Sequence, residues 1–301
     1  MRCILIAGPT ASGKSRLALE LASRRGGVVV NADSMQVYRE LRILSARPAV
    51  EDEAAVPHRL YGHVGAGERY SVGRWLADMR GVLHEANEAG LTPVIVGGTG
   101  LYFKALTEGL VAVPPIPAAV RAGVAAAAEG KTSAELHARL AADDPEDAAA
   151  TRPSDHTRII RALEVFATTG RSIAAWRRLP ATPLIDPAEA ERLVIEPDRA
   201  VLHERIAERA ERMVAAGALA EARAIGAMAL DPHLPAMKAI GLRELLDHLA
   251  GRSSLAEAVA GMKTESRRYA KRQTTWFRNQ MKDWRRIDNT ALELRRPANM
   301  D

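Results

Sequence analysis

A glycine-rich segment near the start of the chain has the residue types and spacing of a phosphate-binding loop. Gly8-Pro9-Thr10-Ala11-Ser12-Gly13-Lys14-Ser15 follows an apolar run over residues 4–7 and precedes a helix-like stretch over residues 16–23. This is the Gly-x-x-x-x-Gly-Lys-Ser/Thr pattern in the strand–turn–helix context that it requires. Backbone N–H groups of such a loop point at phosphates, Lys14 reaches across them, and the Ser15 hydroxyl can hold a Mg²⁺ ion. The segment predicts a site for a nucleotide such as ATP or for another diphosphate. An ordinary glycine-rich turn is the alternative.

Two further polar side chains follow predicted strands. Asp33 follows the predicted strand Val28-Val29-Val30-Asn31, and Thr99 comes after residues 92–96 and the pair Gly97-Gly98. Parallel strands gather their ligands at their carboxyl ends, so both residues are expected at the edge that carries Lys14. Asp33 could act as a general base or support Mg²⁺ from its second shell, or it could only cap a following helix. The two glycines would let the backbone approach a ligand closely.

The order of predicted elements indicates an α/β fold, with a parallel sheet like that of P-loop NTPases flanked by helices. We expect residues 1–112 to form the first part of this core and residues 191–301 to complete it with basic helices. Two proline-rich stretches, at 113–117 and 179–183, bound a helical insertion that we place at 113–190. The strand over residues 92–96 does not end in the Asp that orders Mg²⁺ in nucleotide hydrolases, which weakens the case for a motor or switch NTPase.

The second strong signal is a basic stretch near the end of the chain. Residues 263–286 hold nine Lys or Arg and two acidic residues, a net charge of +7, whereas the whole chain carries +5, so the remaining residues sum to −2. On a helix, one stripe carries Tyr269, Trp276, Gln280 and Trp284, and we assign these rings to core packing. The opposite basic face is typical of polyanion binding and favours nucleic acid over a membrane surface, because a wide Leu/Ile face is missing.

Composition limits the remaining possibilities. The chain has 301 residues, 47% of them hydrophobic and 26% charged, which is ordinary for a soluble globular protein. No run approaches the 18 apolar residues of a membrane span, and the single Cys3 lies in a predicted strand and gives neither a disulfide framework nor metal-ligand spacing. We expect a cytoplasmic protein that does not interact with membranes.

Six segments, in order, resemble the tRNA dimethylallyltransferases, also called isopentenylpyrophosphate (IPP) transferases acting on tRNA. The resemblance covers nearly the whole chain. Its segments are 8–15, 33–38, 96–102, 158–165, 239–241 with Glu244, and 271–278. The chain departs from the usual residues at Ser45 and Arg47, where Thr and Lys are usual, at Thr157, where Gln is usual, and at Ser266, where Thr is usual. The departures at residues 45–48 and at Thr157 could alter how tightly substrate or tRNA is bound.

The resemblance implies transfer of a dimethylallyl group from dimethylallyl diphosphate to N6 of adenosine 37, in tRNAs that read codons beginning with U. It implies a diphosphate site at residues 8–15, with Mg²⁺ at Ser15, and catalytic roles for Lys14, Asp33 and Thr99. Arg47 and Arg158 are candidates for further charge stabilisation. The residues implied in binding the tRNA anticodon stem-loop are Asp33, Ser34, Met35, Gln36, Thr99, Thr157, Arg158, Ile159, Ile160, Arg161, Lys271, Arg272, Gln273, Thr275 and Arg278.

Alternative functions remain open at the level of sequence. A small-molecule phosphotransferase, or an enzyme that prenylates free adenine nucleotides, would share the phosphate loop and Asp33 but has no use for the basic stretch. A pure RNA-binding module would not need Lys14, Ser15 and Asp33. The arginine face with Arg158 and Arg161 is either a solvated helix surface or an anion site. We expect the protein to be a monomer.

Overall fold

The computed structural model describes residues 2–288 and divides the chain into two compact units. The core unit contains the residues up to 107 and those from 184 onward, and the helical unit is Glu108–Pro183. The sequence placed these boundaries later, at 113 and 190. The chain re-enters the core early because the N–H groups of Leu184 and Ile185 both donate to the carbonyl of Leu106, at 2.9 and 3.1 Å. Ile185 is also buried in the main hydrophobic cluster.

A parallel sheet forms the centre of the core unit, as the sequence predicts. Its strands are β1 (Cys3–Ala7), β2 (Gly27–Asn31), β3 (His58–Arg59), β4 (Thr92–Gly97), β5 (Ala190–Ile195) and β6 (Arg285–Ile287). They lie in the order β3-β2-β4-β1-β5-β6, and every strand pair described is parallel. The sequence did not predict β6, because a three-residue strand rich in arginine lacks an apolar run.

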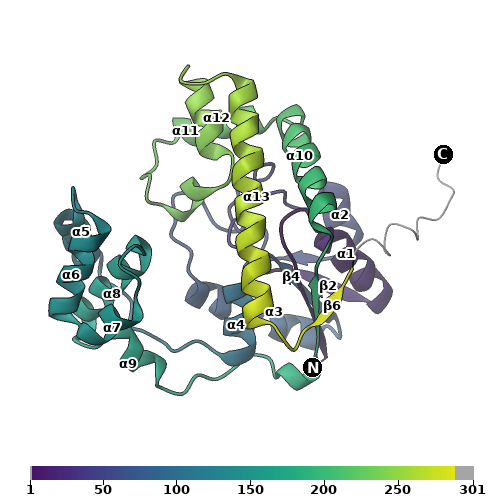
Figure 1. The fold of residues 1–301 in the computed structure, drawn as a ribbon. Helices are drawn as coiled ribbons and strands as arrows, with labels where there is room; N and C mark the ends of the chain where they lie inside the picture. Colours follow the sequence, from purple (N-terminus) through teal and green to yellow (C-terminus); the bar gives the residue numbers. More distant parts are fainter. Residues whose placement is uncertain (1, 289–301) are drawn as a thin grey trace. The chain divides into compact units, whose positions relative to one another are not determined.

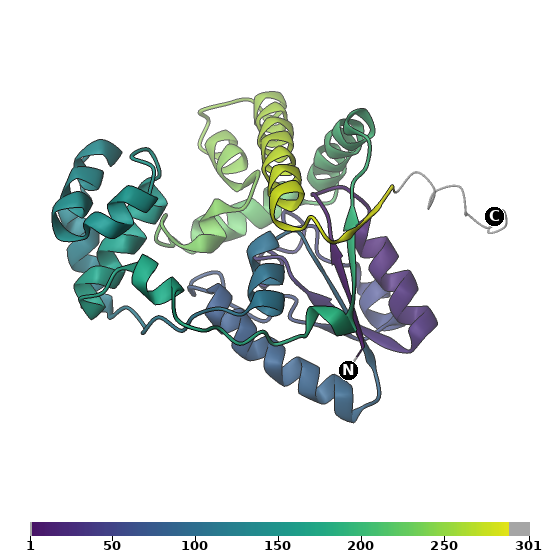
Figure 2. The ribbon, with the colours of Figure 1, turned by 60° about the horizontal axis from the view of Figure 1, so that its bottom comes forward.

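The two faces of the sheet are covered by helices from different parts of the chain (Figure 2). Along β1, Ile4 and Ile6 pack with α1 (Lys14–Arg25), whereas Cys3, Leu5 and Ala7 belong to the main hydrophobic cluster on the other face. That main cluster includes buried residues of α3 (Val72–Glu88) and α4 (Gly100–Glu108). Helix α3 buries apolar residues at helical spacing, including Trp75, Met79 and Leu83, and is capped by Ser71.

The long helix α13 (Leu255–Gln280) runs beside α10 (Arg199–Ala215) and α12 (Leu242–Leu249) in the core unit (Figure 1). The unit also contains α2 (Val50–Ala55), α11 (Ala218–Ala227) and the short 3₁₀ helices Pro187–Glu189 and Pro235–Lys238. Because α13 ends at Gln280, Trp284 is not on it, and the predicted stripe was wrong there. Trp284 is buried against Phe103, with ring centroids 5.4 Å apart, and the deeply buried ring of α13 is Phe277.

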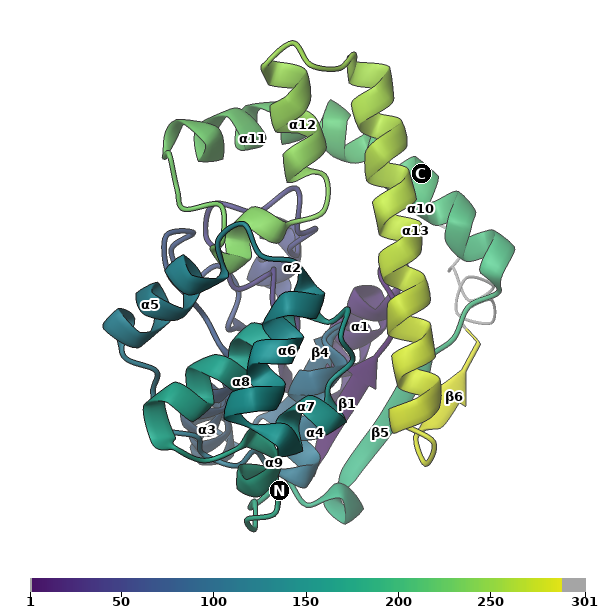
Figure 3. The same cartoon turned by 60° about the vertical axis from the view of Figure 1, so that its left-hand side comes forward.

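The helical unit has its own apolar core. Its helices are α5 (Ala118–Ala128), α6 (Ser133–Asp143), α7 (Pro145–Ala150), α8 (His156–Thr169) and α9 (Ile173–Arg177), which Figure 3 shows grouped together. Leu136, Leu140 and Ile159 are completely buried at its centre. The carboxylate of Asp147 accepts hydrogen bonds from the N–H groups at the start of α9. Across residues 2–288, no helix is long and apolar enough to cross a membrane.

Candidate active site

The carboxyl ends of β2 and β4 approach each other so closely that only glycine fits between them. A Cβ atom on Gly97 would lie 2.0 Å from the carbonyl oxygen of Ala32. The backbones are joined there by two hydrogen bonds, from Ala32 N to Val96 O at 2.8 Å and from Thr99 N to Ala32 O at 3.2 Å. This contact brings the segments that carry Asp33 and Thr99 together, as the sequence predicts.

The phosphate loop leaves β1 and turns directly into α1. Ala11 and Gly13 adopt left-handed backbone conformations, with φ of 62° and 83°, and α1 begins at Lys14. Ser15 is exposed in the first turn of α1. The described residues contain no cluster of three or more His, Cys, Asp or Glu that could hold a metal ion. The residues present fit Mg²⁺ nonetheless, because this ion is commonly held by few protein oxygens together with substrate phosphates.

Lys14 lies in a setting that favours loss of its proton. The side chain is half-buried, and its Nζ is 3.4 Å from the carbonyl of Pro9. The pKa of Lys14 is lowered to about 8, chiefly by burial and also by repulsion from Arg209, whereas the carboxylate of Asp33 acts in the opposite direction. An anion bound in the loop would restore the charge of this lysine, because it supplies the missing counter-charge.

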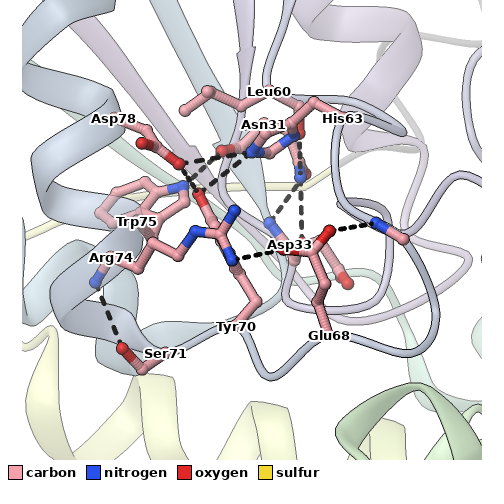
Figure 4. A network of polar contacts seen from close by, with 11 residues as sticks. Asn31, Asp33, Leu60, His63, Glu68, Tyr70, Ser71, Arg74, Trp75 and Asp78 are labelled. Atoms are coloured by element: carbon pink, nitrogen blue, oxygen red, sulfur yellow. Dashed lines mark hydrogen bonds and ion pairs between the residues drawn. The ribbon is translucent and has the colours of Figure 1, made fainter.

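Asp33 is held by Asn31, the last residue of β2 (Figure 4). Asn31 is fully buried, and its side chain accepts from Asp33 N at 2.8 Å and donates to Asp33 O and Leu60 O, both at 3.0 Å. The indole of Trp75 donates to the Asn31 carbonyl at 2.9 Å. Asp33 Oδ1 accepts from Met35 N at 2.9 Å, and turns rather than a helix follow, so the alternative that Asp33 caps a helix is wrong.

Thr99 contacts the residue next to Asp33. Its hydroxyl accepts from Ser34 N at 3.0 Å and donates to Ser34 Oγ at 3.3 Å. The side chain of Thr99 therefore anchors the turn that carries Asp33, and a direct contact with substrate stays a prediction.

A pocket of about 260 Å³ opens beside Asp33. Its polar lining comes from the phosphate loop, the Asp33 turn, the turn at Ser45, the 3₁₀ helix Pro235–Lys238 and the helices α10 and α13. The polar residues are Thr10, Asp33, Ser34, Ser45, Arg209, Lys238, Tyr269 and Arg272. Met35 lines it as well. Burial and the charge of Asp33 raise the pKa of Tyr269 well above its ordinary value. The sequence assigned Tyr269 to core packing, and the structure corrects this, because α13 turns that ring toward the pocket.

Arg209 is a site residue that the sequence analysis missed. It projects from α10, and its Nη2 lies 2.5 Å from the hydroxyl of Thr10 in the phosphate loop. Burial lowers the pKa of Arg209, and the charge of Asp33 opposes that effect. In the sequence, Arg209 stands between Glu208 and Glu211 in an ordinary amphipathic helix, so no local signal separates it from a solvated arginine.

Two glutamines predicted to contact tRNA are instead used inside the protein. Gln36 Nε2 donates to the carbonyls of Ser45 and Ala46, at 3.0 and 2.8 Å. Gln273 is buried, and both of its side-chain polar atoms bond to the backbone of the phosphate loop and of the loop after β4.

Three other residues of α13 are predicted to contact tRNA. Lys271, Thr275 and Arg278 line a second pocket of about 850 Å³, together with Arg199 and His203 of α10. Arg278 bonds to Glu196 at 2.6 Å.

The predicted residues of α8 belong to the helical unit. Thr157, Arg158 and Arg161 are exposed, and the two arginines pair with Asp155 and Glu164 at 3.4 and 3.7 Å. Ile160 is partly buried, and the completely buried Ile159 is a core residue rather than a tRNA contact.

The parallel sheet and the loop between β1 and α1 place the protein in the class of P-loop-like α/β proteins. Within that class, the chain belongs to the IPP transferase family, whose model matches residues 36–280, and an isopentenyl transferase model matches residues 1–63.

Named relatives cover almost the full chain. A tRNA dimethylallyltransferase of Methylobacterium nodulans is 57% identical over 287 residues, covering 94% of each chain. The crystal structure of a tRNA isopentenylpyrophosphate transferase from Bacillus halodurans is 33% identical, with a TM-score of 0.68, and covers 97% of this chain and 94% of that one. A eukaryotic dimethylallyltransferase acting on tRNA is 26% identical, with a TM-score of 0.80, and covers 97% of this chain and 74% of that one.

Proposed function

We propose that this protein transfers a dimethylallyl group from dimethylallyl diphosphate to N6 of adenosine 37, in tRNAs that read codons beginning with U. The observation that carries the proposal is one pocket lined by Asp33, by Thr10 of the phosphate loop and by the cations Arg209, Lys238 and Arg272. The chain that holds it is 57% identical to a named tRNA dimethylallyltransferase.

Binding of the diphosphate is the first part of the reaction. The loop N–H groups, Lys14 and Arg209 are positioned to stabilise the negative charge that develops as the bond between C1 of the allyl group and its oxygen breaks. Mg²⁺, held by Ser15 and the phosphate oxygens, would supply additional positive charge to the leaving diphosphate.

Activation of the adenine amine is the second part. An amine conjugated to a purine is a weak nucleophile, so the protein must orient it toward C1 and take up its proton. Asp33 is the carboxylate in the pocket, and the Asn31 and Met35 contacts fix its orientation. The N6–C1 bond forms, the C1–O bond breaks, the proton passes to Asp33, and diphosphate leaves. Since a stacked base cannot reach a pocket, adenosine 37 must be flipped out of the anticodon loop.

Binding of the anticodon stem-loop is the third part. Lys271, Arg272 and Arg278 supply cations on α13, and Arg158 and Arg161 supply exposed cations on α8. Such contacts bind RNA through its phosphates and orient the loop without reading its sequence. A cytoplasmic location and a monomeric state stay predictions.

The test incubates the protein and Mg²⁺ with labelled dimethylallyl diphosphate and an unmodified anticodon stem-loop carrying A36-A37-A38. Parallel reactions contain AMP or ATP in place of the RNA. We expect label in the RNA alone, lost with Lys14→Ala and strongly reduced with Asp33→Ala. Label in the free nucleotide would indicate a nucleotide prenyltransferase, and ATP turnover without label transfer would indicate a phosphotransferase.

The matched control is Lys131→Ala, an exposed lysine of the helical unit outside every pocket described above. If Asp33→Ala kept full transfer with unchanged RNA binding, the assignment of Asp33 as the base would be wrong.

A further inference from the structure

Gln273 occupies an unusual position on α13. Its neighbours Lys271 and Arg272 are exposed, whereas Gln273 is only 5% exposed. Long polar side chains are rarely buried unless their polar atoms form hydrogen bonds. The hydrogen-bond partners of the Gln273 amide therefore indicate its role.

The two ends of the Gln273 amide bond to two different loops of the site. Its Oε1 accepts from Thr10 N in the phosphate loop at 2.8 Å, across 263 residues of sequence. Its Nε2 donates to Gly98 O, after β4, at 2.8 Å, across 175 residues. One side chain therefore joins the loop after β1 to the loop after β4.

The backbone of the second loop leaves room for this contact. A Cβ on Gly98 would lie 2.2 Å from Gln273 Nε2 and 3.2 Å from Asp33 Oδ2. Only glycine allows the amide to approach at this point, and the same gap holds the carboxylate of Asp33. The amide thus lies at the junction of the phosphate loop, the loop after β4 and the predicted base.

The hydrogen bonds have a direct effect on diphosphate binding. Thr10 N is a backbone donor of the phosphate loop, and Thr10 Oγ1 contacts Arg209. A loop whose Thr10 N lost its acceptor would be free to shift, and the cations that it positions would shift with it. Binding then requires the loop to be reordered, and that cost lowers affinity.

We propose that Gln273 is a positioning residue, rather than a contact for tRNA. It fixes the position of the phosphate loop relative to the sheet edge that carries Asp33. The inference rests on the proposed function only in assigning a diphosphate to the loop. It predicts that substitutions at Gln273 act on diphosphate binding in the absence of RNA.

The experiment measures the Kd of inorganic diphosphate with Mg²⁺ by calorimetry, without RNA and well below the melting temperature. Gln273→Met keeps the volume of the side chain and removes both hydrogen bonds. We expect it to weaken diphosphate binding about 10-fold, the effect of leaving buried partners unsatisfied. The Kd for the anticodon stem-loop, measured without diphosphate, is expected to stay within about 2-fold. Asn279→Ala, at an exposed position on the same helix, is the matched control and is expected to change neither Kd.

Each other result overturns the inference. An RNA contact would lose stem-loop affinity and keep its diphosphate affinity. A residue that only stabilises the fold would lower the melting temperature and leave both Kd values unchanged. If the unsubstituted protein failed to bind diphosphate, the ligand assigned to the loop would be wrong, and the proposed function would fall with the inference. If the unsubstituted protein bound diphosphate and only the Gln273→Met effect were missing, the proposed function would stand without it.

Discussion

Lys14 combines two properties that a phosphate-binding cation requires. It reaches the loop that would bind the anion, and its surroundings make its charge depend on what is bound. Burial and repulsion from Arg209 both disfavour the charged form of Lys14 and lower its pKa. The ammonium of Lys14 is therefore most stable when a diphosphate is bound.

The first prediction concerns pH. Since the free protein has a Lys14 pKa of about 8, the ammonium is charged below that pH and lost above it. We expect kcat/KM for the diphosphate to be level up to about pH 8 and then to fall about tenfold per pH unit, because kcat/KM reports groups of the free enzyme. The break in kcat should lie at higher pH, since bound diphosphate raises the pKa of Lys14.

Lys14→Arg is the control for this profile. Arginine keeps its charge throughout the range, so the break near pH 8 should disappear even if the overall rate is lower. A wild-type profile that stayed level through pH 9.5 would contradict the prediction.

The second prediction concerns Arg209. Replacing it with Ala removes the contact with Thr10 and a cation that lies near Lys14. We expect kcat/KM to fall about 100-fold, which is typical for loss of one charge-stabilising group. Arg209→Lys should recover part of this, because a lysine restores the charge but not the planar guanidinium.

Steady-state kinetics at saturating RNA measures this loss. Arg212→Ala, at an exposed position one turn further along α10, is the control and should retain full activity. Equal losses in the two variants would show that general charge, rather than the position of Arg209, matters.

At the scale of the elements, the packing of β2, β4 and α13 sets how closely the parts of the site approach one another. The ends of β2 and β4 meet at Ala32 and Gly97, with no room for a side chain between them. The same closeness recurs at Gly100, where a Cβ would lie 2.1 Å from the ring of Trp276 on α13. Glycines at these two points allow a sheet edge and a long helix to share one site.

The third prediction tests this packing. We expect Gly97→Ala to lower the free energy of unfolding by about 3 kcal/mol or more, because the added methyl group meets the backbone rather than a movable side chain. Urea denaturation measures the effect. Gly81→Ala, in open space on α3, is the matched control and should raise stability by about 0.5–1 kcal/mol. Equal stability of the two variants would contradict the packing described here.

Sequence reasoning was strongest where the signal is local. The strand, loop and helix around Lys14, the helix α3 and the position of Asp33 follow from patterns within about 20 residues. It was weakest where distant elements meet: Arg209, Tyr269 and Gln273 take their roles from how α10 and α13 lie against the sheet edge. A basic helix with an aromatic stripe does not reveal which ring or amide faces the core and which faces a ligand.

At the scale of the whole molecule, diphosphate binding and RNA binding depend on different sets of charges. Residues 263–286 carry +7, and the remaining residues sum to −2. Diphosphate meets a few partly buried cations, whereas an RNA backbone meets many exposed ones. The two affinities should therefore respond differently to salt.

The fourth prediction follows from this difference. A plot of log affinity for the anticodon stem-loop against log salt concentration should be linear and steep, and Lys271→Ala should reduce its slope by about 1. Filter binding from low to high salt measures it. Arg24→Ala is the control, since Arg24 lies at the far end of α1 and pairs with Glu20, and its slope should match that of the wild type. An unchanged slope in Lys271→Ala would remove that residue from the RNA contacts.

The strand order has a consequence for synthesis. β1 lies between β4 and β5, so it stays an unpaired edge on one side until residue 195 has left the ribosome, a condition that favours wrong association. Thr10 precedes its partner Gln273 by 263 residues, an interval of roughly 13 to 50 s at ordinary elongation rates. During that time the nascent chain has a phosphate loop without the amide that holds it, and it gains a complete site only when α13 emerges.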